Sequence, residues 1–314
     1  MKKILEISQL TKSFDKNCAV NHIDFSIYEG EILCLLGPNG AGKSTTIHML
    51  SGIMKKDTGT IAFMQQDIQS HLRQYQQALG FVPQDIALYE DLTAWQNIHF
   101  FASLYGLKGE VLNQAVYDAI TFAGLMDRKY DKVKTFSGGM KRRLNIACAI
   151  AHHPKFVIMD EPTVGIDPQS RNHILSSIKQ LQAEGMTVLY TTHYMEEVEE
   201  ISDRIIIMDH GEIIAEGTKE QLKANIAKEC QYIIHIDHIE NLDLDEFYKI
   251  AGIQKVMQDK NELQVTTLKD IENLNSIIEE LMRQKQHIQK LTTNETNLET
   301  VFLKLTGRRL RDSI

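Results

Sequence analysis

The chain of 314 residues predicts an α/β fold with a mainly parallel β-sheet, followed by a small α+β domain. Over residues 1–225, short apolar runs alternate with helix-like stretches, which is the pattern of a parallel sheet covered by helices on both faces. The stretch EILCLL is mainly apolar, and FVIMD (156–160) is a short apolar run of the kind that forms a parallel strand buried on both faces. From residue 226 to 314 the order becomes β-α-β-β-α-β, which is typical of a ferredoxin-like domain.

The strands are predicted from alternating or continuous apolar residues bounded by turn residues. ILEISQL, HIDFSI and EILCLL supply the first three, DTGTIAF and LGFVPQ add two more, and FVIMD and TVLYTTH follow. RIIIMDHGEIIAEG predicts a hairpin that turns at His210-Gly211. In the second domain, QYIIHI, QKVMQD, ELQVTT and HIQKLT are the expected strands.

The helices are predicted from apolar residues at helical spacing and from end signals. One helix opens within GKSTTIHML and ends at Gly52, and another, ILSSIKQLQAEG, is closed by Gly185. Thr93 followed by Gln96 is a capping-box pattern, so a helical insert is expected over about residues 85–155. Its last helix is GGMKRRLNIACAIA. MEEVEEIS, LDEFYKIAG and IENLNSIIEELMRQ are the later helices.

Composition narrows the class of protein. The net charge of −8 argues against nucleic acid as the main partner, because that affinity comes largely from Lys and Arg. The four cysteines, Cys18, Cys34, Cys148 and Cys230, form no C-x-x-C pair and are expected to be free thiols in a reducing compartment. No apolar run approaches the ~20 residues that span a bilayer, and no signal-peptide core follows the start. We therefore expect a cytoplasmic protein that acts at a membrane only through a partner.

The stretch GPNGAGKS fits the phosphate-binding pattern G-x-x-x-x-G-K-[ST] and lies between an apolar strand and a helix. In this pattern the glycines let the backbone wrap the phosphates, Lys43 reaches the outer phosphate oxygens, and the Ser44 hydroxyl binds Mg²⁺. A glycine-rich turn with an exposed lysine is the alternative. The candidate phosphate-binding residues are Gly37, Pro38, Asn39, Gly40, Ala41, Gly42, Lys43, Ser44 and Thr45.

Two carboxylates end the strand FVIMD. Asp160 is the expected Mg²⁺ partner, acting through water because Mg²⁺ gives up its hydration reluctantly. Glu161 is the candidate base for an attacking water. The alternative is that the pair simply begins a solvated loop.

Four further short stretches follow along the chain: FVPQ with Gln84, FSGGM with Ser137, VGIDP with Asp167, and TTHYMEE with His193. With the two sites above, residues 1–225 resemble the ATP-binding subunits of ABC transporters from end to end. The resemblance implies a P-loop NTPase cassette with an antiparallel β subdomain, a helical insert, bound ATP and Mg²⁺, and ATPase activity. Phe136, Ile166 and Gln65 depart from the usual family residues without touching a phosphate-contacting group.

The resemblance also implies roles for single residues. Gln84 would sense the γ-phosphate and Mg²⁺, and His193 would hydrogen-bond the γ-phosphate and hold the water in line. Phe14 would stack on the adenine ring, although a phenylalanine near a strand end is core as often as platform. Asp167 is a further candidate nucleotide-binding residue.

A second glycine pair, in FSGGM, opens the helix that follows it. Two cassettes of the family sandwich two ATP molecules head to tail, so Ser137, Gly138 and Gly139 would contact the γ-phosphate held by the opposing chain. Free N–H groups and the dipole at a helix N-terminus suit that contact with an anion. With one cassette in the chain, we expect a homodimer.

The C-terminal sequence indicates which branch of ABC transporter subunits the chain resembles. TTNETNLETVFLKLTG resembles the ending of exporter-type cassettes of the drug-resistance branch, although Leu298, Val301, Phe302 and Leu305 also fit a plain packing helix. Separate integral membrane permease subunits are the implied partners, contacted through the loop after Gln84 (or that loop is an ordinary surface loop). They would hold the chain at the inner face of the cell membrane. A cassette ATPase acting on ribosomes or DNA is the main alternative, and a small-molecule phosphotransferase ranks last.

Overall fold

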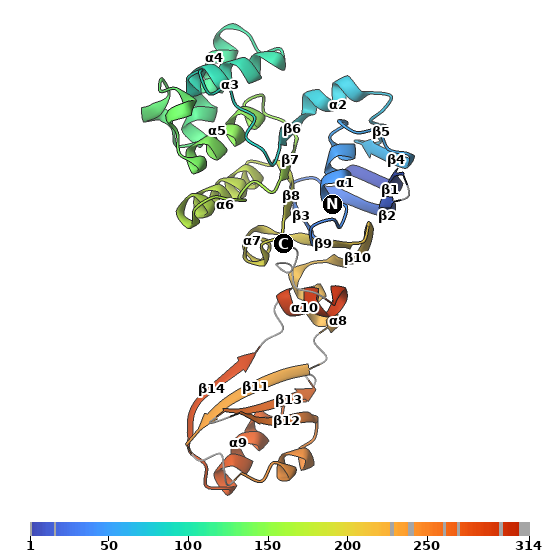
Figure 1. Cartoon of the computed structure of the whole chain (residues 1–314), viewed down its shortest axis with the longest axis vertical. Helices are drawn as coiled ribbons and strands as arrows, with labels where there is room; N and C mark the ends of the chain where they lie inside the picture. The colour runs from blue at the N-terminus through green and yellow to red at the C-terminus, as the bar shows by residue number, and fades with distance from the viewer. Residues whose placement is uncertain are drawn as a thin grey trace. The chain divides into compact units, whose positions relative to one another are not determined.

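The computed structural model describes residues 2–15, 17–226, 229–237, 242–259, 262–268, 271–294 and 298–307. The chain divides into two compact units, residues 1–219 and residues 220–307 (Figure 1). Residues 308–314 of the predicted second domain, and 295–297 of its tail motif, lie outside the described ranges. Each unit has its own hydrophobic core.

A six-stranded, mainly parallel sheet forms the centre of the first unit, as predicted. Its strand order is β10-β9-β3-β8-β7-β6, and only the β9–β10 hairpin is antiparallel. The strands are β3 (Ile32–Leu36), β6 (Leu79–Val82), β7 (Phe156–Asp160), β8 (Thr187–Thr192), β9 (Arg204–Asp209) and β10 (Glu212–Gly217). Strands β3, β7 and β8 are buried along their whole length, which explains their continuous apolar sequences.

Helices cover both faces of this sheet. Helices α6 (Pro168–Ala183) and α7 (Met195–Ile201) lie on one face, and α1 (Lys43–Leu50) lies on the other (Figure 1). The topology places the carboxyl ends of β3, β8, β7 and β6 side by side. In open α/β sheets this edge is where ligands bind.

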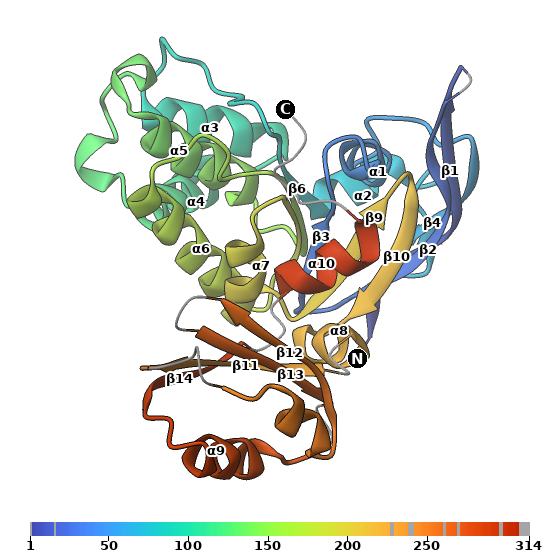
Figure 2. The ribbon, with the colours of Figure 1, turned by 60° about the horizontal axis from the view of Figure 1, so that its bottom comes forward.

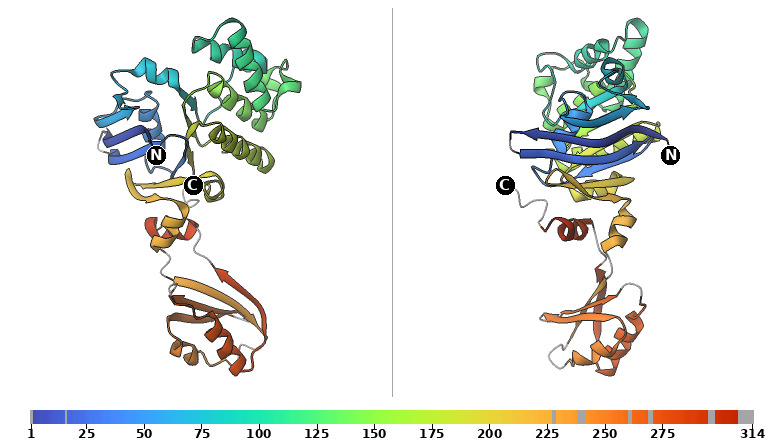
Figure 3. Two further views of the ribbon diagram at one scale, coloured as in Figure 1. Left: turned by 180° about the vertical axis from the view of Figure 1, so that it is seen from behind. Right: turned by 90° about the vertical axis from the view of Figure 1, so that its right-hand side faces the viewer.

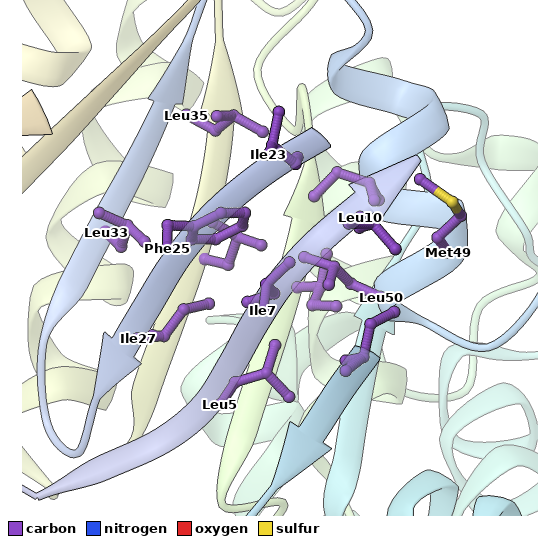
Figure 4. Close-up of a cluster of buried hydrophobic side chains, with 14 of the residues drawn as sticks. Leu5, Ile7, Leu10, Ile23, Phe25, Ile27, Leu33, Leu35, Met49 and Leu50 are labelled. Atoms are coloured by element: carbon purple, nitrogen blue, oxygen red, sulfur yellow. The ribbon is translucent and has the colours of Figure 1, made fainter. Parts of the chain in front are cut away.

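A second, antiparallel sheet packs beside α1 and has the order β2-β1-β4-β5. Its long strands β1 (Lys3–Phe14) and β2 (Asn17–Tyr28) run side by side (Figure 3), and β4 (Thr58–Phe63) and β5 (Gln66–Asp67) complete it. Alternate side chains of β1 and β2 meet β3 and α1 in one core (Figure 4). The β4–β5 turn holds Met64 and Gln65 at φ of 49° and 68°, which is the backbone reason that glycine suits the Gln65 position.

The predicted helical insert contains α3 (Ala94–Leu104), α4 (Gly109–Phe122) and α5 (Gly138–Ile150), which group together apart from the antiparallel sheet (Figure 2). The capping box is present, with Thr93 and Gln96 each accepting the other's backbone N–H. Short 3₁₀ turns, η1 (Met126–Arg128) and η2 (Val133–Thr135), connect α4 to α5. Helix α2 (Leu72–Ala78) was not predicted, because only Tyr75 on it is buried and it carries no apolar period.

The second unit has one antiparallel sheet of order β12-β13-β11-β14, the ferredoxin-like arrangement. Its elements are α8 (Lys219–Ile226), β11 (Glu229–Ile236), η4 (Asp245–Lys249), β12 (Ile253–Asp259), β13 (Glu262–Leu268), α9 (Leu274–Arg283), β14 (Ile288–Asn294) and α10 (Leu298–Thr306). The predicted helix in LDEFYKIAG is only the 3₁₀ helix η4, whose single fully buried anchor is Phe247. On α10, Leu298, Val301 and Phe302 are buried, as a packing helix requires, but the predicted fourth packing residue, Leu305, is exposed.

Candidate functional site

The phosphate-binding loop joins the carboxyl end of β3 to the N-terminus of α1. Gly40 and Gly42 adopt φ of 80° and 99°, a left-handed conformation that residues with a Cβ rarely take. A Cβ on Gly42 would also lie 2.3 Å from the backbone oxygen of Ala19. The pattern therefore forms a backbone cradle at a helix N-terminus, where free N–H groups favour an anion.

Lys43 projects into this cradle from the first turn of α1. Its Nζ donates to the carbonyl oxygens of Gly37 (2.7 Å) and Pro38 (3.1 Å). An ammonium group has three N–H donors, so one is left for a phosphate oxygen. Burial lowers the pKa of Lys43, and the charges of Glu161 and Asp160 offset part of that effect.

A cavity of about 490 Å³ opens over the cradle. Phosphate-loop residues line one side of it, Phe14 and the start of β2 line another, and Gln84 and Glu161 complete it. The lining residues are Phe14, Asn17, Cys18, Ala19, Asn39, Gly40, Gly42, Lys43, Ser44, Thr45, Gln84, Glu161 and His210. Phe14 is 46% exposed at the end of β1, so its ring is available as a platform and is not part of the core.

The acidic pair follows β7, directly beside β8. The Thr191 hydroxyl donates to Asp160 Oδ1 (2.7 Å) and accepts the backbone N–H of Glu161 (2.9 Å). Glu161 has a φ of 43°, a left-handed backbone conformation that costs free energy and is common at functional sites. Burial raises the pKa of Asp160 in spite of its bond from Thr191. The pair does not begin a solvated loop, because both residues are buried.

Glu161 lies between two groups that favour its charged form. Glu161 Oε1 is 3.8 Å from Lys43 Nζ, and Glu161 Oε2 is 3.2 Å from His193 Nδ1. His193 is the first residue after β8. Burial by itself would raise the pKa of Glu161, but the close approach of His193 and the charge of Lys43 outweigh it, and the net shift is downward. Glu161 is therefore an ionised carboxylate at neutral pH, able to accept a proton.

Ser137, Gly138 and Gly139, which are predicted to contact the partner's nucleotide, and Asp167, a further candidate nucleotide-binding residue, lie outside the lining of this cavity. Ser137 is the N-cap of α5, and Asp167 is the N-cap of α6. Gly139 is buried against α6, where a Cβ would lie 2.2 Å from Ser170 Oγ. Nine of the predicted site residues are absent from the described lining of the cavity: Gly37, Pro38, Ala41, Ser137, Gly138, Gly139, Asp160, Asp167 and His193.

Sequence reasoning missed the residues that support the site. Thr191 has no motif of its own, although the register of β7 and β8 pairs it with Asp160. Four residues after His193 in the chain, the buried carboxylate of Glu197 accepts hydrogen bonds from the hydroxyls of Tyr190 (2.8 Å) and Thr192 (2.7 Å). Asn17, Cys18, Ala19 and His210 line the cavity, and in the sequence they are ordinary turn and strand residues.

The residues also fit a hydrated magnesium ion. Ser44 is exposed beside the cradle, Gln84 lines the same cavity, and Asp160 is a buried carboxylate at the end of β7. Hydroxyl, amide and carboxylate oxygens are the ligands that Mg²⁺ prefers. Within the described ranges, no group of three or more His, Cys, Asp or Glu side chains is placed to hold a metal ion by itself.

Comparison with known proteins decides the family. The ABC transporter family model matches residues 20–164. The linearmycin resistance ATP-binding protein of Bacillus subtilis is 43% identical over 98% of this chain and 100% of its own length. The chain belongs to the ABC transporter ATP-binding subunits.

Other relatives agree with this membership. The Nod factor export ATP-binding protein I of Cupriavidus pinatubonensis is 34% identical over 98% of this chain and 92% of its own. A bacterial ABC transporter cassette solved as a dimer has a TM-score of 0.63 at 26% identity, covering 68% of this chain and 98% of that one. The cassette thus binds ATP and is an ATPase of the ABC type, and its relatives include subunits named for Nod factor export and linearmycin resistance. The ribosome or DNA alternative is not favoured.

Proposed function

We propose that this cassette hydrolyses Mg²⁺-ATP to drive export through separate membrane subunits. The observation that carries the proposal is the meeting of Lys43, Gln84 and Glu161 around one cavity, with His193 against Glu161. This arrangement supplies a cation for the γ-phosphate and a base for water. A phosphotransferase that used the same cradle would need neither His193 nor α5 with the FSGGM sequence at its start, which we call the signature helix.

In the proposed reaction, Lys43 and the cradle N–H groups hold the β- and γ-phosphates, and Phe14 stacks on the adenine. Ser44, Gln84 and, through water, Asp160 would hold Mg²⁺, which would neutralise negative charge on the phosphates. Glu161 accepts a proton from the water that attacks the γ-phosphorus, while the bond to ADP breaks and inorganic phosphate leaves. His193 orients Glu161 and the γ-phosphate. We expect Glu161→Gln to bind ATP and to hydrolyse it about 10²–10⁴-fold more slowly.

Two chains would share the two sites. Ser137, Gly138 and Gly139 lie at the N-terminus of α5, whose dipole and free N–H groups suit the partner's γ-phosphate. A mixture of Lys43→Ala and Ser137→Ala chains tests this sharing. In the mixed dimer, one ATP site contains both substitutions, whereas the other combines an intact Lys43 with an intact Ser137 from the opposing chain. Partial recovery of ATPase activity is therefore expected. Absence of any recovery would contradict shared sites.

The membrane subunits would bind beside the loop that follows Gln84. Tyr89 is 51% exposed and Phe100 is 36% exposed, and their rings meet edge to face at 5.0 Å. An exposed aromatic pair next to the γ-phosphate sensor fits a contact that passes the state of the nucleotide to a permease. Within the described ranges, no helix is long and apolar enough to cross a bilayer. The cassette would therefore be held at the inner face of the membrane by its partners.

The deciding experiment uses the slow Glu161→Gln chain, tagged and trapped with ATP in a mild-detergent extract of its own cells. A polytopic membrane protein recovered in stoichiometric amount supports the proposal. Lys43→Ala is the matched control, because it cannot close on ATP and should recover less of that protein. Ribosomes, or a soluble partner in place of the membrane protein, would overturn the transport role while leaving the ATPase assignment intact.

A further inference from the structure

We propose that Arg142 is a positioning residue that joins the Gln84 loop to the signature helix α5. Through it, the nucleotide in a chain's own cradle would set the position of the Ser137 end that this chain offers to its partner. The inference rests on the proposed function and deepens it, because it names the physical link between the two composite sites.

The side chain of Arg142 binds the backbone of the Gln84 loop. Its Nη1 donates to the carbonyl oxygen of Pro83 (2.8 Å), and its Nη2 donates to that of Gln84. The side chain is only 3% exposed, although it carries a charge. A guanidinium presents a rigid fork of donors, so two bonds to successive carbonyls define both the place and the direction of that backbone.

Further bonds attach the rest of the loop to the helical insert. Asn145, one turn after Arg142, accepts the N–H of Ala87 (3.3 Å). Asn97 of α3 is fully buried, accepts the N–H of Tyr89 (2.8 Å), and donates to its carbonyl oxygen (3.0 Å). The Gln84 loop is thus bound to α3 and α5 along its length. In the described structure, Arg142 is the side chain that reaches Gln84 itself.

Helix α5 connects Arg142 to Ser137 at its N-terminus. Ser137 caps α5, and Arg142 lies five residues further along the same helix, roughly 7.5 Å away at 1.5 Å per residue. A helix of this kind moves as a body, because its backbone bonds are internal. A shift of the Gln84 carbonyl toward a bound γ-phosphate therefore moves Arg142, and with it Ser137.

The contact also has unused donors. Arg142 Nε and Asn145 Nδ2 are buried and lack a hydrogen-bond partner among the described residues. Buried donors without partners cost free energy, and under the proposal the loop position adopted with bound ATP would give them partners.

The test is made in the Glu161→Gln background, where ATP-driven dimers accumulate. Arg142→Met removes both bonds to the loop, and Arg142→Lys keeps the charge without the fork. Arg143→Met is the matched control, because Arg143 is the next residue of α5 but donates to Ala123 O (2.8 Å) at the end of α4 and not to the loop. Dimer formation against ATP concentration is followed by analytical ultracentrifugation. The affinity of the dilute monomer for a fluorescent ATP analogue is measured separately.

We expect Arg142→Met to need about tenfold more ATP for half-maximal dimer, within the usual range for coupling between two sites, with monomer affinity changed less than about twofold. Arg142→Lys should lie between it and the parent, and Arg143→Met should match the parent. Equal curves for Arg142→Met and the parent would overturn the inference while leaving the proposed function standing. An equal shift in Arg143→Met would also overturn it, because helix stability would then be the cause. A parent that forms no dimer with ATP would instead refute the shared-site function itself.

Discussion

Replacing Gly139 by alanine tests how the signature helix is seated. An added Cβ would lie 2.2 Å from Ser170 Oγ and 2.6 Å from Ser170 Cβ. Rotating the serine side chain removes the first clash but not the second, so α5 and α6 must separate. Overpacking of this kind costs about 1–3 kcal/mol, and we expect about 2 kcal/mol for Gly139→Ala.

The second substitution in this test is Ser170→Gly, which removes the obstructing atoms. Alone, it should cost no more than about 1 kcal/mol, the usual penalty of glycine in a helix. Combined with Gly139→Ala, it should recover about 1–2 kcal/mol relative to the sum of the two single changes. Gly138→Ala is the control, because a Cβ there would meet its nearest atom at 4.0 Å and stability should hardly change.

Urea unfolding followed by the fluorescence of Trp95 measures these free energies. Trp95 is the single tryptophan of the chain and packs against the buried cluster that includes Phe136 and Leu144. Unfolding curves for Gly139→Ala that overlay those of the parent, or strictly additive effects of the two changes, would refute the packing argument. A Gly138→Ala chain as unstable as Gly139→Ala would refute it too.

Three further predictions follow from single contacts. Burial raises the pKa of Asp160, so folding favours the protonated form of this side chain. Its contribution to the free energy of unfolding is therefore lost as the pH rises through the folded-state pKa. Asp160→Asn should therefore raise the Tm of the nucleotide-free chain at neutral pH and abolish the further rise with Mg²⁺-ATP; an unchanged or lower Tm would contradict this. Cys18 is exposed in the cavity, so ATP should protect it from N-ethylmaleimide in peptide mapping but leave Cys230 of the second unit reactive, and equal labelling of Cys18 with and without ATP would place the nucleotide elsewhere. Gln65→Gly should stabilise the chain by about 0.5–1 kcal/mol in urea unfolding, because it relieves a left-handed turn; a loss of stability would show that the Gln65 side chain matters more than its backbone.

Much of the first unit could be predicted because its signals are local. The phosphate loop is recognisable by its glycine spacing, and the helix at Thr93 by a capping box that closes within one turn. The burial of β3, β7 and β8 shows directly in their apolar residues. Helix α2 and the short η4 were not predicted correctly, because tertiary packing at Tyr75 and Phe247 holds them and no periodic pattern does.

The sequence by itself determined which groups this protein has for its chemistry: the cradle, the acidic pair, the histidine, and the second glycine pair on its own helix. Only the tertiary structure decided how they act on one another. The strand order β3-β8-β7-β6 brings Lys43, His193, Glu161 and Gln84 to one edge of the sheet, although up to 150 residues separate them in the chain. The pKa of Glu161 and the link from Arg142 to Gln84 depend on distances of a few ångströms between such segments. Those distances arise from long-range strand pairing and packing, which a local sequence pattern does not specify.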